Sequence, residues 1–375
     1  MPTFAHQFTA ANGTKTTNSI SLTVQEIENA AVLEVLQSPG ATLGHWQFLG
    51  ALLDPTVATF SFQQPLGHAR EVKTAISGLF GRFVARAYAT RHLGLTHFAH
   101  VRKPPMPLGG VMRGQLRRVP NRRGDMPDWV AWGSTVGMAI VEAKGCHDIK
   151  GPQAALDRAY IQANRAEIRV GRRPAPFKRY AIATRWGFTS PKVSAPMLWV
   201  RDPDEDGEIN DAEMESLQVA IARWHIGALM LSLGHEALGK PLLELTRQSF
   251  KNRVGDAQRR ALAALKEAGP VMVEGDNAPD VPLVGGYVGR TGHFNSAELE
   301  DSELEILRKL DLRPTFVGVE LDAIKQAIEG TTRRTLPAVE ADGSLSLRDG
   351  EDGAGSWVLS LDSELRRVLP LNRGS

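Results

Sequence analysis

Three residues whose types suit phosphodiester hydrolysis lie close together in the sequence. Asp128 follows Pro127, and Glu142 and Lys144 come shortly after with Ala143 between them. Two carboxylates can hold one or two hard divalent cations, which prefer oxygen ligands. Such a cation polarises a phosphoryl oxygen and lowers the pKa of a bound water, and a neighbouring lysine can orient or deprotonate that water. We therefore predict a hydrolytic site dependent on Mg²⁺ or Mn²⁺.

The elements around these residues would bring them together. Residues 136–143 read as a strand that is apolar on both faces, which is typical of a central buried strand. Because side chains alternate along a strand, Glu142 and Lys144 emerge on one face at its end. Residues 129–132 read as the preceding strand, and a hairpin would place Asp128 near Glu142. The alternative is an ordinary aspartate turn with an exposed glutamate–lysine pair at a strand end.

The wider pattern predicts an α/β core over residues 66–200. Its expected order is helix, strand, strand, strand, helix and strand. The expected helices cover 68–92 and 152–170, a loop rich in Pro, Gly and Arg covers 103–124, and the expected strands cover 95–101, 129–132, 136–143, 180–184 and 197–200. The three candidate residues all lie at strand ends of this core.

The segments 124–128 (GDMPD) and 141–145 (VEAKG) resemble the motif of the PD-(D/E)XK nuclease superfamily, which has the restriction-endonuclease-like fold. The core order above is also the order of that family. The resemblance implies that Asp128 and Glu142 bind the metal with help from the Ala143 backbone carbonyl, and that Lys144 is the catalytic lysine. It implies a mixed central sheet flanked by helices and a DNA endonuclease. Defence against foreign DNA is the biological role that it most often implies.

Two further positions fit places that many family members fill. A glutamate on the first core helix corresponds to Glu71, although a surface charge on an amphipathic helix is an equally good interpretation. A glutamine on the helix after the lysine strand corresponds to Gln153. Tyr160 follows Gln153 by seven residues, so the glutamine-to-tyrosine spacing of exonuclease-type members is not kept. An endonuclease is therefore favoured over an exonuclease.

Charge is distributed unevenly along a chain of net charge +2. Residues 66–201 hold 24 basic and 7 acidic side chains, a net charge of +17, whereas residues 202–375 hold 19 basic and 31 acidic ones. A strongly basic block indicates a polyanionic partner, and we expect DNA, with RNA as the alternative. Arginines expected to contact its phosphates are Arg113, Arg117, Arg118, Arg122 and Arg123. The other interpretation is a solvated face neutralised by the acidic block.

Residues 202–213 match the twelve-residue loop of an EF-hand. Acidic or amide ligands stand at the required positions, glycine is at position 6, and a glutamate is at position 12. The expected Ca²⁺ ligands are Asp202, Asp204, Asp206, Glu208 through its backbone carbonyl, Asn210 and Glu213. A strand precedes the loop where an EF-hand has a helix, so we expect a lone strand–loop–helix calcium site that braces the core. The alternative is an acidic turn that caps the following helix.

The sequence divides into four expected regions. They are an N-terminal helical segment (1–65), the nuclease core (66–200), a segment of the calcium loop and long helices (201–268), and an acidic α+β module (269–375). In the first, Ser21 or Thr23 is expected to cap a helix over 24–36. We expect the last region to bind a protein partner or a second copy of the chain.

The composition limits the compartment and leaves three functions open. A single cysteine, Cys146, excludes an internal disulfide, and a cytoplasmic location is the simplest interpretation. No apolar run is long enough to predict a membrane span, and the polar N-terminus has no signal-peptide pattern. The protein is then an active metal-dependent endonuclease, a catalytically silent nucleic-acid-binding subunit, or a calcium-braced protein-interaction module.

Overall fold

The structure is a computed structural model of the chain. It describes residues 3–38, 61–62, 70–109, 114–133, 136–147, 150–188, 194–202, 209–247, 251–274, 278–289, 292–295, 315–331, 338–340, 344–360 and 367–370.

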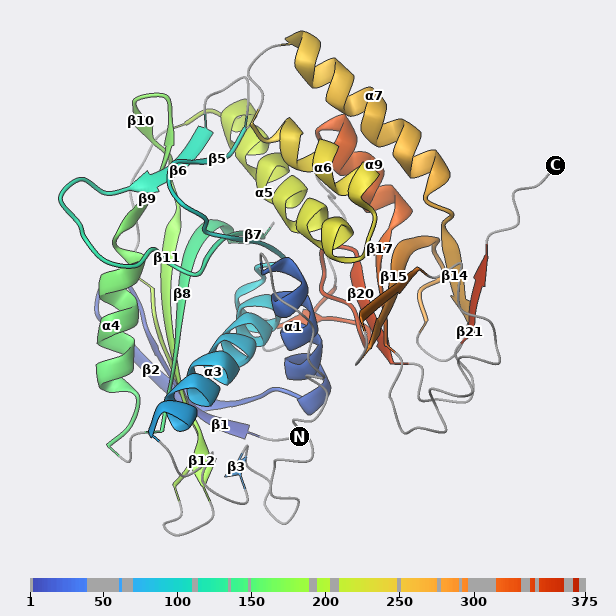
Figure 1. The fold of residues 1–375 in the computed structure, drawn as a ribbon. Coiled ribbons are helices and arrows are strands. Elements are labelled where there is room, and N and C mark those ends of the chain that lie inside the picture. The colour runs from blue at the N-terminus through green and yellow to red at the C-terminus, as the bar shows by residue number, and fades with distance from the viewer. Residues whose placement is uncertain are drawn as a thin grey trace.

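The centre of the molecule is a seven-stranded mixed sheet with the order β2-β1-β13-β11-β8-β7-β4 (Figure 1). In that order its strands are β2 (Lys15–Ser21), β1 (Thr3–Thr9), β13 (Met197–Arg201), β11 (Lys178–Arg185), β8 (Gly137–Cys146), β7 (Trp129–Gly133) and β4 (His97–His100). The pairs β8–β11 and β1–β13 are parallel, and the other neighbours are antiparallel. The protein is therefore a mixed α/β protein, as predicted.

Helices cover both faces of this sheet. They are α1 (Val24–Gln37) and α3 (Arg70–Leu93) on one face, and α4 (Gln153–Ala163) and α5 (Asp211–Ser232) on the other. Side chains of β8 alternate between the two: Ala139 and Val141 pack with α1 and α3, whereas Met138 and Ile140 pack with α5. Figure 1 shows α3 and α4 on opposite sides of the strands. The apolar pattern on both faces of β8 thus reflects a central strand in a three-layer arrangement.

The end of β8 lies against the backbone of α3. A Cβ atom added to Gly81 would lie 2.4 Å from the Gly145 backbone nitrogen, and one added to Gly145 would lie 1.6 Å from the Ser77 carbonyl oxygen. Neither position therefore accepts a side chain without backbone movement. This contact fixes the helix against the strand one residue after Lys144.

The predicted N-terminal helical segment is wrong for its first part. Thr3–Thr9 and Lys15–Ser21 form a β-hairpin, and β1 adds to the central sheet beside β13. Threonine and phenylalanine suit strands, and the sheet edge supplies the partner that the sequence alone does not show. The helix expected after them is confirmed as α1, and Thr23 caps it in a capping box with Glu26.

The helix predicted over 152–170 is too long. α4 ends at Ala163, and β9 (Ala166–Val170) follows, with alternating buried and half-buried side chains. β9 pairs with β6 (Gly114–Arg118), a strand within the segment predicted as a loop. The remaining strands of this four-stranded sheet are β5 (Met106–Pro107) and β10 (Arg173–Pro174). The alternation of AEIRV was a strand signal that the preceding helical run obscured.

The rest of the described chain forms helices and an antiparallel sheet. The helices are α6 (Glu236–Leu245), α7 (Lys251–Glu267) and α9 (Leu321–Glu329). The sheet contains β14 (Val271–Glu274), β15 (Leu283–Gly289), β16 (Gly292–Asn295), β17 (Thr315–Glu320), β20 (Ser356–Ser360) and β21 (Arg367–Pro370). Short pairs are β3 (Ser61–Phe62) with β12 (Gly187–Phe188), and β18 (Ala338–Val339) with β19 (Leu345–Ser346). The α+β content predicted for residues 269–375 is present, and one hydrophobic cluster joins this region to α1 and α5.

In the part of the chain that the structure describes, no helix is both long and apolar enough to span a membrane.

Candidate active site

The β7–β8 hairpin brings Asp128 and Glu142 together. Trp129 pairs with Val141, and continuing that register by one residue puts Asp128 opposite Glu142. The Asp128 backbone N–H donates to Glu142 Oε2 (3.0 Å), and the Ala143 backbone N–H donates to Asp128 Oδ2 (2.9 Å). Each carboxylate is therefore oriented by the backbone of the strand that carries the other.

Lys144 lies beside Glu142 on the same face of β8. Its ammonium group forms an ion pair with Glu142 Oε1. The Glu142 side chain is 0% exposed and that of Lys144 is 32% exposed. The lysine therefore lies between the buried carboxylate and the solvent.

The charge of Glu142 is poorly compensated. Burial raises the pKa of Glu142 well above its ordinary value, and the nearby charge of Asp128 raises it further, while Lys144 opposes both effects. Two carboxylates this close at neutral pH favour either an extra proton or a bound cation. The electrostatics of the pair therefore match a cation-binding site.

The oxygen donors here fit a hard divalent cation. Glu142 Oε1 accepts no hydrogen bond in the described structure, although it contacts Lys144. The Ala143 N–H points to the β7 side, and in an extended strand the carbonyl of the same residue points that way too. Continuing the register of β7 and β8 places Pro127 opposite Ala143. Because proline has no N–H, it cannot donate a hydrogen bond to the Ala143 carbonyl. Asp128, Glu142 and the Ala143 carbonyl therefore form the oxygen set that Mg²⁺ or Mn²⁺ prefers.

The set contains only two carboxylates. No group of three or more His, Cys, Asp or Glu side chains suited to a metal occurs among the described residues. Mg²⁺ commonly keeps several waters and is held by one or two carboxylates plus substrate phosphates. The donor set is thus sufficient for Mg²⁺ and too small for a closed structural site.

Arg82 and Glu34 join the site, and the sequence did not indicate either. Arg82 on α3 lies 3.6 Å through Nε from Asp128 Oδ1 and 2.6 Å through Nη2 from Glu34 Oε1. Glu34 on α1 is buried and also accepts hydrogen bonds from Trp129 Nε1 (3.0 Å) and Arg86 (3.2 Å). Burial alone would raise the pKa of Glu34, but the charges of His100, Arg82 and Arg86 lower it far below its ordinary value.

One sequence signal could have pointed to this network. Glu34 is the only charged residue within the apolar run 30–36 of α1. A lone acid on such a run indicates a buried charge with a cationic partner. The partner itself could not be found, because Arg82 lies on another helix 48 residues later.

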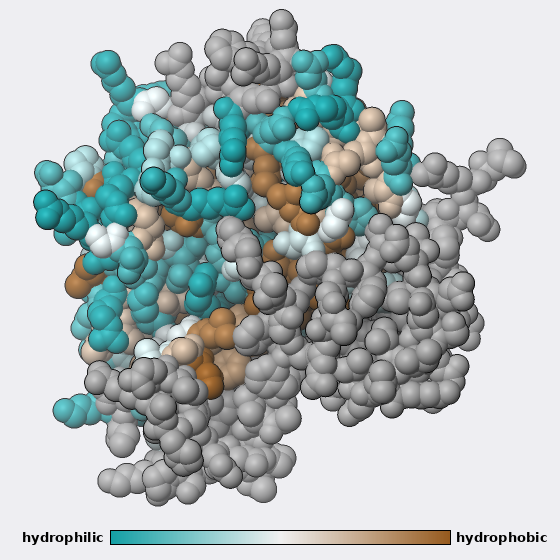
Figure 2. Space-filling model, in the orientation of Figure 1, coloured by the Kyte–Doolittle hydropathy of each residue, from teal (hydrophilic) through white to brown (hydrophobic). Residues whose placement is uncertain are grey.

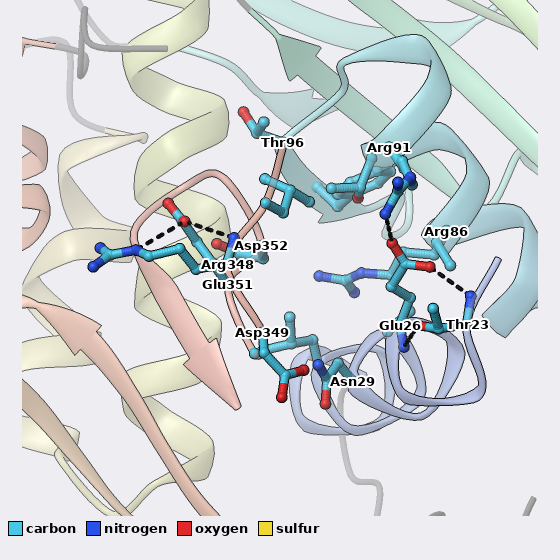
Figure 3. A pocket seen from close by; sticks show the side chains of 17 residues that line it. Thr23, Glu26, Asn29, Arg86, Arg91, Thr96, Arg348, Asp349, Glu351 and Asp352 are labelled. Carbon is cyan, nitrogen blue, oxygen red and sulfur yellow. Dashed lines mark hydrogen bonds and ion pairs between the residues drawn. The ribbon is translucent and has the colours of Figure 1, made fainter. Parts of the chain in front are cut away.

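Arg86 also lines a cavity of about 200 Å³ (Figure 3). Its walls come from α1, α3, the start of β4 and the segment 347–352, and none of the three candidate catalytic residues lines it. Figure 3 shows Glu26 bonded to Arg91 and to the Thr23 backbone on one wall, with Asp352 across the space. Burial lowers the pKa of Arg86, and the negative charge of Asp352 acts against this shift. Asp352 of the C-terminal region therefore belongs to the same network of charges.

Gln153 and Glu71, the two further positions predicted from the resemblance, each lie in the first turn of a helix. Gln153 opens α4, is exposed, and donates to Asp157 Oδ1 (2.9 Å) on the same helix. Gln162 in the last turn of α4 instead donates to the Met126 carbonyl (2.7 Å), two residues before Asp128. Glu71 lies in the first turn of α3, and its side chain is outside the described part, so its role stays a prediction.

The predicted phosphate-binding arginines are scattered. Arg117 is paired with Glu167 (2.5 Å), and Arg118 donates to the Arg122 carbonyl (3.3 Å). Arg122 and Arg123 are exposed in the turn before Asp128, and Arg113 lies outside the described residues. The structure therefore does not gather the five predicted arginines into one described cluster.

The candidate calcium loop is described only at its two ends. Asp202 is paired with Lys178 (2.9 Å). Asn210 caps α5 in a capping box with Glu213, which also pairs with Arg173. Asp204, Asp206 and Glu208 lie outside the described residues. The strand–loop–helix order is as predicted, the capping contacts also fit the alternative, and Ca²⁺ binding stays a prediction.

Comparison of the chain with protein-family models, with curated proteins and with solved structures found no match.

Proposed function

We propose that the protein is a metal-dependent endonuclease that hydrolyses phosphodiester bonds of DNA. The observation that carries the proposal is the reciprocal pair of Asp128 and Glu142, with Lys144 beside them. A buried carboxylate whose pKa is raised by burial and by a second carboxylate is costly to maintain in a structural role. A bound divalent cation would neutralise the buried negative charge of the two carboxylates and so offset the free energy that their burial costs.

The strand order supports a restriction-endonuclease-like core. α3 precedes the antiparallel strands β4, β7 and β8, and α4 then connects β8 to the parallel neighbour β11. This is the helix-strand-strand-strand-helix-strand order expected for the PD-(D/E)XK superfamily, with β5 and β6 inserted before β7, and β9 and β10 before β11. The candidate ligands lie at the edge where β7 begins and β8 ends.

Each residue of the site then has a distinct task. When bound, Mg²⁺ or Mn²⁺ would polarise a phosphoryl oxygen and lower the pKa of a water. Asp128 and Glu142 would hold it with the Ala143 carbonyl, and one backbone N–H donor orients each carboxylate. Lys144 is placed to orient the attacking water and to stabilise negative charge on the pentacovalent phosphorus. Arg82 forms an ion pair with Asp128 Oδ1, the oxygen that does not accept the Ala143 N–H.

A second candidate is a nucleic-acid-binding subunit without catalysis. It is favoured by the presence of only two carboxylates among the described residues of the site, and by the contact of Arg82 with Asp128, which competes with a cation. Such a protein would bind DNA with a steep salt dependence and never cut it.

Plasmid cleavage with Mg²⁺ or Mn²⁺ tests the proposal. We expect nicking or linearisation that EDTA abolishes and that Lys144→Ala reduces by about 10²–10⁴-fold, the usual contribution of such a group. The matched control is Lys240→Ala, which removes an exposed lysine paired with Glu236 on α6 and should cut normally. Full activity of Lys144→Ala in a folded protein would refute the assignment. Binding without cleavage by the wild type would favour the silent subunit.

A further inference from the structure

A basic groove of about 790 Å³ lies apart from the three candidate catalytic residues. Its walls come from the β4–β5 connection, the β5–β6 segment, the turn between β9 and β10, α5, and the residue that follows α6 and its cap. In the orientation of Figure 1, hydrophilic residues cover much of the surface over β6, β9 and β10 (Figure 2). The groove is thus assembled from four separate parts of the chain, because the first two of these segments adjoin.

Every charged side chain that lines this groove is basic. They are Arg102, Lys103, Arg172 and Arg247. None of the four has an ion pair within the described part of the chain. Burial lowers the pKa of Arg102, and the like charge of Arg247 lowers it further. Cations held together without acidic partners are stabilised when an anion binds between them.

Trp224 fixes the two arginines in place. Its Nε1 donates to the Pro107 carbonyl (2.9 Å), and the indole is buried in the core. The guanidinium carbons of Arg102 and Arg247 lie 4.9 and 5.6 Å from its ring centre. Cation–π contacts of this kind orient a guanidinium while its N–H groups stay available. The groove is therefore preorganised for an oxyanion.

A backbone hydrogen bond connects one wall of the groove to the candidate active site. The Val101 backbone N–H donates to the Asp128 carbonyl (3.0 Å), and Arg102 is the next residue. Trp224 packs in the same cluster as Met138 and Ile140, the residues that share the β8 face with Glu142. The hydrogen bond thus joins the segment that carries Arg102 and Lys103 to the backbone of Asp128.

We propose that this groove binds the phosphodiester backbone of the nucleic acid that the candidate site cleaves. This inference rests on the proposed nuclease function and adds the path of the substrate. Four cations on three segments exceed what a single phosphate needs, and the open groove that they line suits a run of phosphates. The contacts are to backbone charge, so binding is expected to be independent of sequence.

Anisotropy of a fluorescent 20-base-pair duplex, titrated in EDTA at several salt concentrations, tests the groove without cleavage. The test variant is Arg102→Gln/Arg247→Gln. We expect at least tenfold weaker binding at low salt and a salt slope smaller by about two, because each phosphate contact contributes about one. The matched control is Arg259→Gln/Arg260→Gln on α7, two exposed arginines with acidic partners, which should bind as the wild type does.

Two outcomes would overturn the proposal. One is a duplex affinity and a salt slope that stay unchanged both in Arg102→Gln/Arg247→Gln and in Lys103→Gln/Arg172→Gln. Lys103 and Arg172 are exposed, so their substitution should leave the fold intact. The other is equally tight binding of poly-glutamate, which would make the groove a site for acidic protein segments. Failure of the nuclease proposal looks different: the wild type would bind the duplex through this groove, yet Mg²⁺ would produce no cleavage.

Discussion

Glu34 and Glu142 are both buried, and glutamine substitutions at the two sites should change stability in opposite directions. Glu34 is surrounded by cations that lower its pKa, and removing one partner of a buried charge cluster costs about 3–5 kcal/mol. Burial raises the pKa of Glu142, and the charge of Asp128 raises it further. In EDTA at pH 8, Glu142→Gln should therefore stabilise the fold by about 1–3 kcal/mol, the usual cost of an incompletely compensated buried polar group.

The pH dependence follows from the direction of each shift. The folded-state pKa of Glu34 is lowered, so its contribution is complete above the ordinary value of 4.5 and is lost as the pH falls further. The folded-state pKa of Glu142 is raised, so the wild type loses stability as the pH rises above 4.5, until Glu142 ionises. The advantage of Glu142→Gln should accordingly grow with pH and vanish in acid.

Thermal unfolding of the wild type and both variants between pH 4 and 9, with EDTA or Mg²⁺, measures these effects. Mg²⁺ should raise the Tm of the wild type and reduce the advantage of Glu142→Gln, because ligand binding stabilises only the protein that holds it. Glu167→Gln is the control, since that carboxylate is paired and partly exposed. A Glu142→Gln variant less stable than the wild type at pH 8 in EDTA would refute the reasoning.

Two other predictions concern the contact between α3 and the end of β8, and the candidate calcium loop. Gly81→Ala should destabilise the protein by about 1–3 kcal/mol and lower cleavage, because its Cβ would overlap the β8 backbone. Gly78→Ala on the same helix meets no atom within 4 Å and should be neutral or stabilising by up to about 1 kcal/mol in chemical denaturation; equal effects would contradict this packing. Millimolar Ca²⁺ should raise the Tm through residues 202–213, whereas Asp204→Asn/Asp206→Asn should remove the response. An unchanged wild-type Tm would exclude the calcium loop.

The core of the candidate site could be predicted because its contacts are local in sequence. Asp128 and Glu142 are joined by one short hairpin, and alternation along β8 decides which side chains share a face. The apolar run on both faces identifies a central strand without knowledge of its neighbours. Strand periodicity and a tight turn were therefore sufficient for the arrangement of the two carboxylates and Lys144.

The remaining parts depend on contacts between distant segments. Glu34 meets Arg82 only after α1 and α3 pack, and Arg102 meets Arg247 only around Trp224 of α5. The strand β9 is short and follows α4 almost directly, so the helical pattern concealed it. Periodicity describes one element at a time and does not show which surfaces of two elements meet.

The parallel pairing of β1 with β13 also sets the order in which a new chain can be completed. Ala5 pairs with Met197, 192 residues later. At a synthesis rate of about 5–20 residues per second, the N-terminal hairpin waits on the order of 10–40 seconds for its neighbour to leave the ribosome. The strands β7 and β8 are made during that interval, but α5 and the C-terminal region that flank them are not. A nascent chain therefore carries Asp128, Glu142 and Lys144 well before the sheet that holds them is complete, so the candidate site is assembled late in synthesis.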